Sequence, residues 1–302
     1  MLFKSELRAG RIVYTNDLPI YAAFDAAAVR FPGQLISDVP AALNAMLLEG
    51  ALDLSPISAF AYAAHAGRFA LLPELCIGSR RDVWSVLCVS PRPLEELGDV
   101  TIAVTRESAS GRNLLRVLLE RRFGVRARFV DSDDPYAAAE RGEAALLIGD
   151  RAIDALQNFP KEQVHDLGRH WHAWTGCDMV YAVWAVRRDV LQTRPEDVIA
   201  AVSALVAAQR WGAANPSRVV AAAEAVRPRP RGFYEAYYDT LNFAFDLQAR
   251  AGLQRYVEEL HAIGAIDRIP SVEPELLLAG AASSTEQSSG VHRRFGPGIR
   301  AG

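Results

Sequence analysis

Long apolar segments are missing from this 302-residue sequence. No apolar run reaches the roughly 20 residues that a membrane-spanning helix needs. The first ten residues also carry Glu6 and Arg8, where a secretory leader would need an unbroken apolar stretch. We therefore expect a cytoplasmic location and no membrane partner.

Cysteine is scarce as well. Cys76 and Cys88 lie in apolar runs, and together with Cys177 they make an odd number without metal-ligand spacing. Buried free thiols are therefore expected, which suits a reducing compartment. His170 and His172 do not favour a metal, because two histidines two residues apart leave a helix on different faces and no acidic or Cys partner completes a set. We expect no metal site.

Charge of one sign and cofactor motifs are also absent. The net charge is −3, 23% of the residues are charged, and no block of like charges occurs. This argues against a nucleic-acid partner. The glycines near positions 111 and 149 form neither G-x-G-x-x-G nor a P-loop, and no G-x-S-x-G elbow is present. We expect no cofactor and no serine-nucleophile triad.

The most informative stretch that is present covers residues 101–116. An apolar run leads into a small, hydroxyl-rich turn, after which leucines recur at helical spacing and Gly124 is placed to end the helix. Ser108, Ser110 and Gly111 therefore lie where a strand passes into a helix N-terminus. Free N–H groups and the helix dipole favour a carboxylate or phosphate at such a place. The alternative is that Ser108 or Ser110 only caps the helix.

The rest of the chain alternates between short apolar runs and helical spacing, and it becomes helical from Pro195 onward. This order predicts an α/β fold with mixed, mostly parallel sheets. Strands are predicted at residues 11–14, 35–39, 51–55, 71–77, 83–89, 100–104, 127–130, 144–148 and 179–186. Pro91 and Pro93 break the pattern. We predict one lobe from residues 1–92 plus 180–280, a second lobe from 93–179, and a disordered tail at 281–302.

Small polar residues recur where the predicted strands end. Ligands gather at the carboxyl ends of strands in such sheets, so two units of this kind would line a cleft with hydroxyl and amide donors and few fixed charges. The candidates are Asn16, Ser55, Ser58, Ser79, Ser85, Thr105, Ser108, Ser110, Gly111, Gly149 and Asp150. Asp150 is equally well placed to cap the helix that follows it. A small polyanionic organic molecule suits this cleft.

Several segments resemble, in spacing and order, the chorismate dehydratases of the futalosine route to menaquinone. They are Asn16-Asp-Leu-Pro19, Leu52–Ser58, Ile77–Ser79 with Val83–Val86, Thr105–Leu115, Leu147–Asp150 and Asp166–Trp184. The resemblance covers roughly residues 11–270. It implies a periplasmic-binding-protein-like fold of the second type, with two lobes around a ligand cleft. It also implies loss of water from chorismate to give 3-[(1-carboxyvinyl)oxy]benzoate, without a cofactor.

Two positions depart from the family pattern. Ala109 stands where a Thr is usual, and Arg80-Arg-Asp82 replaces a smaller linker. Both departures bear on individual contacts with the substrate more than on the activity.

The chemistry of this substrate is compatible with the candidate residues. Chorismate is a dianion that becomes aromatic on losing water, so orientation and electrostatic preorganisation suffice without a strong base. We hypothesise that Asn16 positions the departing hydroxyl or the enolpyruvyl group, while the turn 108–111 holds one carboxylate. Ser79 or Ser85 would contact the other polar edge. The substrate's own enolpyruvyl carboxylate is the candidate proton acceptor.

Two other functions fit the same fold. A solute-binding protein for a small organic anion, cytoplasmic or secreted, would have the same lobes, although the missing leader argues against it. The sister dihydroxynaphthoate synthase of the same pathway also resembles this fold but relies on a cleft histidine. The histidines here lie outside the predicted strand-end turns. Nothing in the sequence indicates an oligomer.

Overall fold

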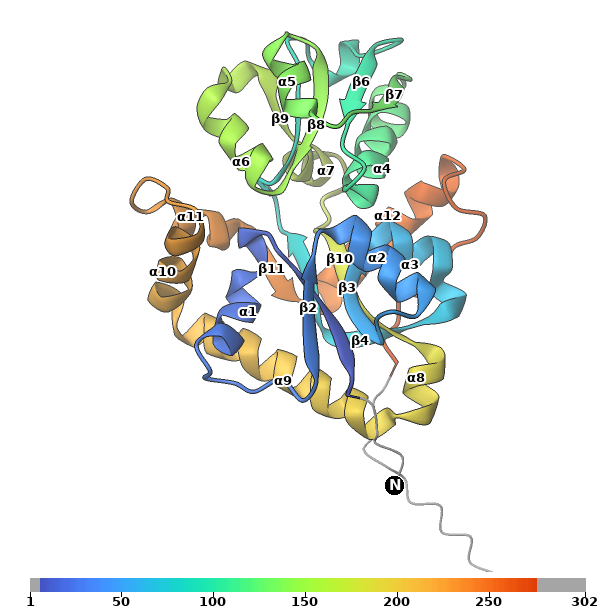
Figure 1. Cartoon of the computed structure of the whole chain (residues 1–302). Helices are drawn as coiled ribbons and strands as arrows, with labels where there is room; N and C mark the ends of the chain where they lie inside the picture. Colours follow the sequence, from blue (N-terminus) through green and yellow to red (C-terminus); the bar gives the residue numbers. More distant parts are fainter. Residues whose placement is uncertain (1–5, 276–302) are drawn as a thin grey trace, which may run out of the picture.

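The computed structural model describes residues 6–275, which form two α/β lobes, one above the other in Figure 1. Each lobe has its own sheet. Lobe I comprises residues 6–79 and 179–275, lobe II comprises residues 86–178, and residues 80–85 connect them. No helix among the described residues is long and apolar enough to cross a membrane.

The sheet of lobe I has six strands in the order β11-β4-β10-β3-β1-β2. β1 pairs in parallel with β2 and β3, whereas β10 runs antiparallel to β3 and β4, and β11 runs antiparallel to β4. The strands are β1 (Arg8–Ile12), β2 (Gln34–Asp38), β3 (Leu54–Ser58), β4 (Phe69–Ser79), β10 (Met179–Arg187) and β11 (Leu241–Ala244).

The sheet of lobe II has five strands in the order β7-β6-β8-β5-β9. β6 is parallel to β7 and β8, and β5 is antiparallel to β8 and β9. The strands are β5 (Val86–Val89), β6 (Thr101–Val104), β7 (Arg128–Asp131), β8 (Ala144–Ile148) and β9 (Val164–Asp166). The α/β architecture with mixed sheets is confirmed, with a larger share of antiparallel pairs than the strand–helix alternation indicated.

Helices cover the sheets, and eight of the twelve described α-helices begin with a proline in the first turn or with a side-chain cap. Pro40 opens α2, and Gly50 ends it in the left-handed conformation at φ 83°. The helices are α1 (Leu18–Asp25), α2 (Pro40–Glu49), α3 (Ala59–His65), α4 (Ala109–Val117), α5 (Pro135–Glu140), α6 (Gly149–Asn158), α7 (Leu167–Thr175), α8 (Arg188–Thr193), α9 (Pro195–Ala214), α10 (Pro216–Val226), α11 (Phe233–Thr240) and α12 (Leu247–Ala262).

The crossover between the lobes lies earlier than predicted. β5 hydrogen-bonds to β8 and β9, so it belongs to lobe II, and the chain leaves lobe I after Ser79 rather than at Pro91 and Pro93. Apolar periodicity could not reveal this, because the partners of β5 come much later in the chain. The return to lobe I occurs at Met179, where β10 begins. The predicted tail 281–302 lies outside the described residues.

The third strand is also shifted along the chain. The sequence predicted a strand at 51–55, but β3 extends to Ser58 and includes Pro56, which lies opposite Trp184 of β10. On its other side β3 pairs with β1 only at Leu54, so the missing N–H of the proline breaks no ladder bond. Helix α3 therefore begins three residues later than Pro56, and Ser58 becomes its N-cap.

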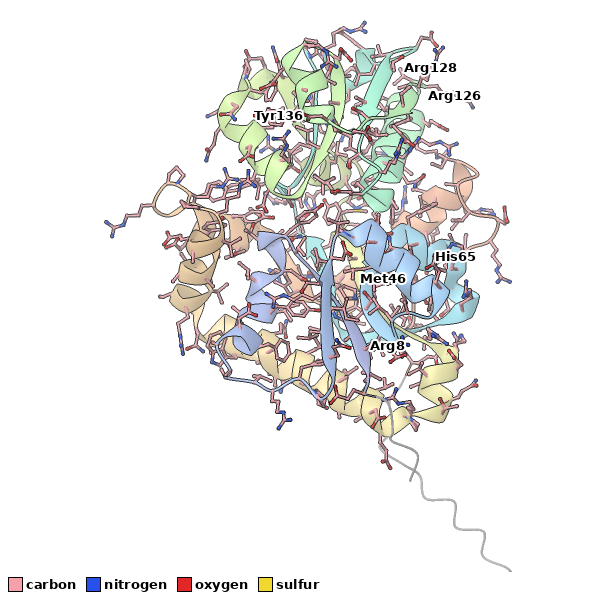
Figure 2. The ribbon with its side chains drawn as sticks, in the orientation of Figure 1. Arg8, Met46, His65, Arg126, Arg128 and Tyr136 are labelled. Atoms are coloured by element: carbon pink, nitrogen blue, oxygen red, sulfur yellow. The ribbon has the colours of Figure 1, made fainter. Side chains whose placement is uncertain are left out.

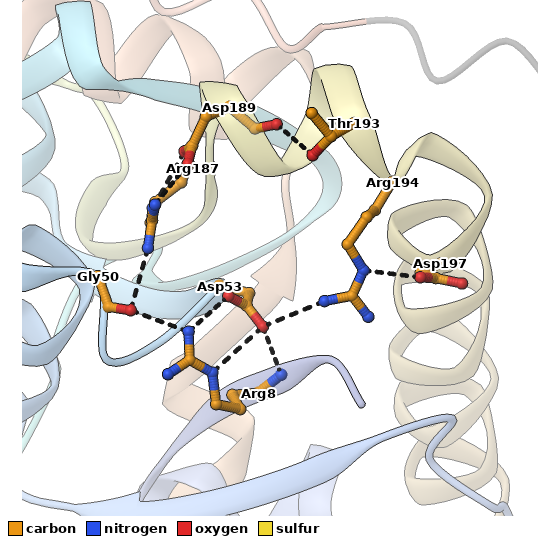
Figure 3. A network of polar contacts seen from close by, with 8 residues as sticks. All are labelled: Arg8, Gly50, Asp53, Arg187, Asp189, Thr193, Arg194 and Asp197. Carbon is orange, nitrogen blue, oxygen red and sulfur yellow. Dashed lines mark hydrogen bonds and ion pairs between the residues drawn. The ribbon is translucent and has the colours of Figure 1, made fainter. Parts of the chain in front are cut away.

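A polar network ties together the end of lobe I that lies away from lobe II (Figure 3). The buried Asp53 accepts the backbone N–H and the guanidinium of Arg8, each at 2.8 Å, and Arg194 approaches it at 3.7 Å. Arg8 and Arg187 also donate to the carbonyl of Gly50. Figure 2 labels Arg8 near the bottom of lobe I. The network therefore stabilises the scaffold at a distance from the lobe junction.

Helix α12 belongs to lobe I but also contacts lobe II. The Tyr256 ring packs edge-on against Trp171 of α7, with ring centroids 6.0 Å apart, and its hydroxyl donates to the Ser110 carbonyl at 2.9 Å. Arg121 pairs with Glu259 at 2.9 Å. These contacts hold α4 and α7 against the scaffold of lobe I.

Candidate functional site

A cavity lies between the two lobes, and its empty space of about 690 Å³ includes the part that is open to solvent. Its walls come from strand ends and turns of both lobes, as the sequence predicted. Seven of the eleven candidate residues line it: Asn16, Ser58, Ser85, Ser108, Ser110, Gly111 and Gly149. Tyr14, Glu107 and Tyr181 also line it and were not among the candidates.

The N-terminus of α4 faces this cavity. The first backbone bond of the helix joins the N–H of Arg112 to the carbonyl of Ser108, which leaves the N–H groups of residues 109–111 without helical partners. The Ser108 side chain makes no capping hydrogen bond. A Cβ at Gly111 would lie 2.4 Å from the Ser108 Oγ and 3.0 Å from Val86 Cγ1, so only glycine lets the turn sit this close to β5. The turn is therefore built to offer donors to an anion.

Ser110 has a different environment from Ser108. Its Oγ donates to the Tyr181 carbonyl at 2.9 Å and accepts the Phe60 N–H at 3.2 Å, and both partners belong to lobe I. The side chain is buried. Ser110 thus joins the lobes at the edge of the cavity, and its hydroxyl has one donor and one acceptor contact within the protein.

Asn16 faces the cavity from lobe I. It lies in the 3-10 turn Thr15–Asp17 between β1 and α1, and its Oδ1 atom is buried without a hydrogen-bond partner among the described residues. A buried amide oxygen without a partner is costly, so its presence at a cavity wall indicates a contact that a ligand completes.

The two residues that precede Asn16 reach across to lobe II. The Tyr14 hydroxyl donates to Glu107 Oε2 at 2.5 Å, and the Thr15 hydroxyl donates to Asp150 Oδ1 at 2.6 Å. Burial raises the pKa of Tyr14, and the hydrogen bond to Glu107 raises it further, so the phenol remains protonated. Glu107 is the one charged side chain among the described residues that line the cavity. An anion must therefore be held by dipoles and hydroxyl groups.

Asp17 lies behind the same turn and is fully buried. It accepts the Ile12 N–H at 3.2 Å, while its Oδ1 has no partner among the described residues. Burial raises the pKa of this carboxyl to about 7, against the lowering effects of the Ile12 N–H and Arg11. Asp17 therefore supports the turn that carries Asn16 from inside lobe I.

Four candidates do not line the cavity. Ser55 donates to the Pro56 carbonyl, and Thr105 accepts the Glu107 N–H. Ser79 lies 3.4 Å from the Tyr181 hydroxyl, behind the cavity wall. Asp150 is engaged by Thr15 as described above. Ser55 was misplaced because the predicted strand, 51–55, begins and ends three residues too early. Ser55 lies near the start of β3 rather than at its carboxyl end.

Besides Ser110, two of the candidates that line the cavity already have partners within the protein. Ser58 accepts the Ala61 N–H as the N-cap of α3, and Ser85 donates to the Val83 carbonyl at 3.2 Å. Ser108 differs, because no capping bond occupies its hydroxyl. Asn16 and Ser108 are therefore the candidate side chains best placed to bind a ligand.

No histidine among the described residues lines the cavity. His165 and His170 lie near each other in lobe II, with ring centroids 6.0 Å apart. Burial lowers the pKa of both, and together with Arg122 it brings that of His170 to about 4. His172 lines a separate pocket that also includes Cys177.

Sequence reasoning missed Tyr14, Asp17 and Glu107, although each lies within two residues of a candidate. Tyr14 and Asp17 flank Asn16 in the turn, and Glu107 directly precedes Ser108. The available signal was the position of ionisable side chains within the two turns that carry the best candidates. The strand-end pattern of small polar residues did not include these three residues.

The chain is similar to known proteins in sequence and in structure. It is 31% identical over 264 residues to the chorismate dehydratase of Thermus thermophilus. This alignment covers 82% of this chain and 92% of that protein. It is 29% identical over 187 residues to the 1,4-dihydroxy-6-naphtoate synthase of the same organism, which covers 61% of this chain and 67% of that protein. The structure resembles the periplasmic aliphatic sulphonate binding protein of Escherichia coli with a TM-score of 0.63 and 15% identity, over 92% of this chain and 95% of that one.

These similarities confirm the predicted fold and family. The two lobes around a cavity are those of a periplasmic-binding-protein-like fold. A family model described as menaquinone biosynthesis matches residues 7–262. The chain belongs to this menaquinone biosynthesis family.

Proposed function

We propose that this protein removes water from chorismate to give 3-[(1-carboxyvinyl)oxy]benzoate, as a hydro-lyase that needs no cofactor. The observation that carries the proposal is the buried, unpaired Oδ1 of Asn16, which faces a cavity bounded on the lobe II side by the free N-terminus of α4. The similarity to a chorismate dehydratase over 82% of the chain supports the same substrate.

The turn at α4 binds one carboxylate of chorismate in this proposal. Residues 108–111 all line the cavity, the N–H groups of residues 109–111 lack helical partners, and the helix dipole adds positive potential there. Glu107 brings a negative charge to the cavity, so these donors must hold the anion without help from a cation in the lining.

Asn16 acts on the reacting part of the substrate. Its amide group hydrogen-bonds and positions the departing hydroxyl or the enolpyruvyl group. The substrate's own enolpyruvyl carboxylate takes the ring proton and passes it to the departing hydroxyl group. The C–H and C–O bonds of the ring break, the third ring double bond forms, and water leaves. Because the ring becomes aromatic, the protein needs to supply orientation and a preorganised set of dipoles rather than a strong base.

The test is to incubate the purified protein with chorismate and to follow the ultraviolet spectrum, with the product identified by mass spectrometry. We expect conversion to the aromatic product by the wild-type protein. Asn16→Ala should lower kcat by about 10²–10³-fold, the cost of removing one preorganised polar group from an active site. A folded Asn16→Ala protein with wild-type turnover would remove Asn16 from the mechanism.

Two alternative functions predict other outcomes of the same assay. Saturable binding of chorismate without conversion would indicate a solute-binding protein, which the likeness to the sulphonate-binding structure allows. The sister synthase of the pathway is less favoured, because no histidine of the described chain lines the cavity. We also propose a cytoplasmic location, which the free thiols Cys76 and Cys88 support.

A further inference from the structure

The turn that carries Asn16 is fastened to lobe II at the two residues that precede it. Tyr14 donates to Glu107 in the loop between β6 and α4, and Thr15 donates to Asp150 in the first turn of α6. From behind, the Tyr238 hydroxyl of α11 donates to the Thr15 carbonyl at 2.9 Å. The position of this turn therefore depends on contacts with both lobes.

The Tyr14 ring is also enclosed by lobe II. A Cβ at Gly149 would lie 3.1 Å from Tyr14 Cδ2, and Gly149 has a φ of +57°, which side-chain-bearing residues rarely adopt. Gly149, directly after β8, thus leaves room for the Tyr14 ring, while Glu107 accepts the hydrogen bond from the Tyr14 hydroxyl. Tyr14 bridges two adjacent strand ends of lobe II from its position in lobe I.

These contacts link the two halves of the site directly. Glu107 immediately precedes Ser108 of the anion-binding turn, and Tyr14 lies two residues before Asn16. The Tyr14–Glu107 hydrogen bond therefore sets how far Asn16 lies from the N-terminus of α4. A movement that separated the lobes here would part the two half-sites.

We propose that Tyr14 and Glu107, supported by Thr15 and Asp150, are positioning residues that align Asn16 with the α4 turn when the cleft is closed. The substrate enters when these bonds are broken, and water is lost after they re-form. This inference rests on the proposed function for its substrate. Asp150, a predicted ligand of the substrate, takes the role of a contact between the lobes.

We expect substitutions of Tyr14 and Glu107 to lower kcat without adding to each other. An open protein still offers the α4 turn to the substrate, but it reacts only in the fraction of time that Asn16 is aligned. Tyr14→Phe and Glu107→Ala should each lower kcat about 10-fold with KM changed by no more than about threefold, as expected for the loss of one charge-assisted hydrogen bond. The double variant should be no slower than Glu107→Ala alone, because both changes remove the same bond.

Two further variants separate positioning from other roles. Glu107→Gln keeps an oxygen acceptor for the Tyr14 hydroxyl, so it should recover most of the kcat lost in Glu107→Ala. Tyr136→Phe makes the same chemical change as Tyr14→Phe at a site in lobe II, where the hydroxyl accepts from Asn158 at 2.7 Å (Figure 2), and it should leave kcat unchanged.

Small-angle scattering on the same proteins gives a readout that does not depend on chorismate turnover. Tyr14→Phe, Glu107→Ala and the double variant should share a larger radius of gyration than the wild-type protein and Tyr136→Phe. If the wild-type protein leaves chorismate unchanged, the proposed function fails while the scattering still tests the contact. Additive losses in the double variant, or an unchanged radius, would overturn the proposal. So would a Glu107→Gln protein as slow as Glu107→Ala, which would show that the charge itself acts on the substrate.

Discussion

Ser108 and Ser110 are two hydroxyl groups two residues apart that have different tasks. The Ser110 hydroxyl satisfies a backbone carbonyl and a backbone N–H of lobe I at a buried position, whereas no capping bond engages Ser108. From the sequence both were candidates for the same anion, with helix capping as the alternative. The structure favours neither capping assignment, and it assigns Ser110 to the contact between the lobes.

Ser110→Ala should therefore destabilise the protein. The substitution leaves the Phe60 N–H and the Tyr181 carbonyl unpaired in a buried junction, which costs about 1–3 kcal/mol of unfolding free energy. Urea denaturation measures this change. Ser108→Ala is the matched control and should alter stability by less than about 0.5 kcal/mol while weakening substrate binding. Equal stability of the Ser110→Ala and wild-type proteins would contradict the assignment.

Asp17 gives the stability of the protein a defined pH dependence. Its pKa is raised to about 7 by burial, while the carboxyl of the unfolded chain titrates near its usual value of about 3.9. Between these values the folded state binds a proton that the unfolded state releases, so this residue lowers stability as the pH rises from about 4 to 7.

Asp17→Asn should remove this pH dependence. Asparagine cannot ionise, yet it retains an acceptor for the Ile12 N–H. The variant should therefore gain stability relative to the wild-type protein as the pH rises through this window, and hold the gain above it. Unfolding free energies at about pH 5 and pH 8 measure the change. If the unfolding free energies of the variant and the wild-type protein differ by the same amount at both pH values, Asp17 is ionised throughout this range.

At the scale of elements, helix α6 is tied to the segment between α10 and α11. Asp154 on α6 receives Arg229 at 2.7 Å and also pairs with Arg227. The Arg229 side chain is only 6% exposed, so its charge depends on this partner. The ion pairs join lobe II to the C-terminal helices of lobe I on the same side as the Thr15–Asp150 contact.

Asp154→Asn should weaken this connection. It leaves a buried guanidinium without its carboxylate, which we expect to cost about 2–3 kcal/mol of unfolding free energy. Asp131→Asn is the control, because its ion pair with Arg112 is exposed to solvent and should contribute little to stability. Thermal or urea unfolding of both variants tests the difference. Similar small losses in the two proteins would mean that solvent replaces Asp154 as the partner of Arg229.

The element boundaries show which local signals were sufficient. Pro40 and Gly50 bound α2, and Gly124 ends the π-helical segment Leu118–Phe123, which continues α4, in a left-handed conformation at φ 70°. Each of these signals resides in one residue. The strand predicted at 83–89 was too long, because Trp84 has a φ of +60° and turns the chain between the lobes. No local pattern marks a tryptophan for that conformation.

At the scale of the whole molecule, two α/β lobes around a cavity could be predicted, and so could most of the cavity's hydroxyl and amide groups. Strand-end turns meet at one edge of a sheet, so their convergence follows from the order of elements. The contacts between the lobes could not be predicted. Tyr14 meets Glu107 across 93 residues of sequence and Thr15 meets Asp150 across 135, and neither pair has a signature in spacing or composition.

Helix α12 gives the assembly of the site an order in time. Every residue that lines the cavity lies at or before position 241, so all of them leave the ribosome before residues 247–262. The turn at the start of α4 nevertheless depends on this last helix. The Tyr256 hydroxyl donates to the Ser110 carbonyl, and Arg121 pairs with Glu259. A nascent chain, or one cleaved before α12, contains every residue that lines the cavity. It lacks the contacts from α12 that fix the anion-binding turn. Docking of α12 is therefore the step of biosynthesis that completes the site.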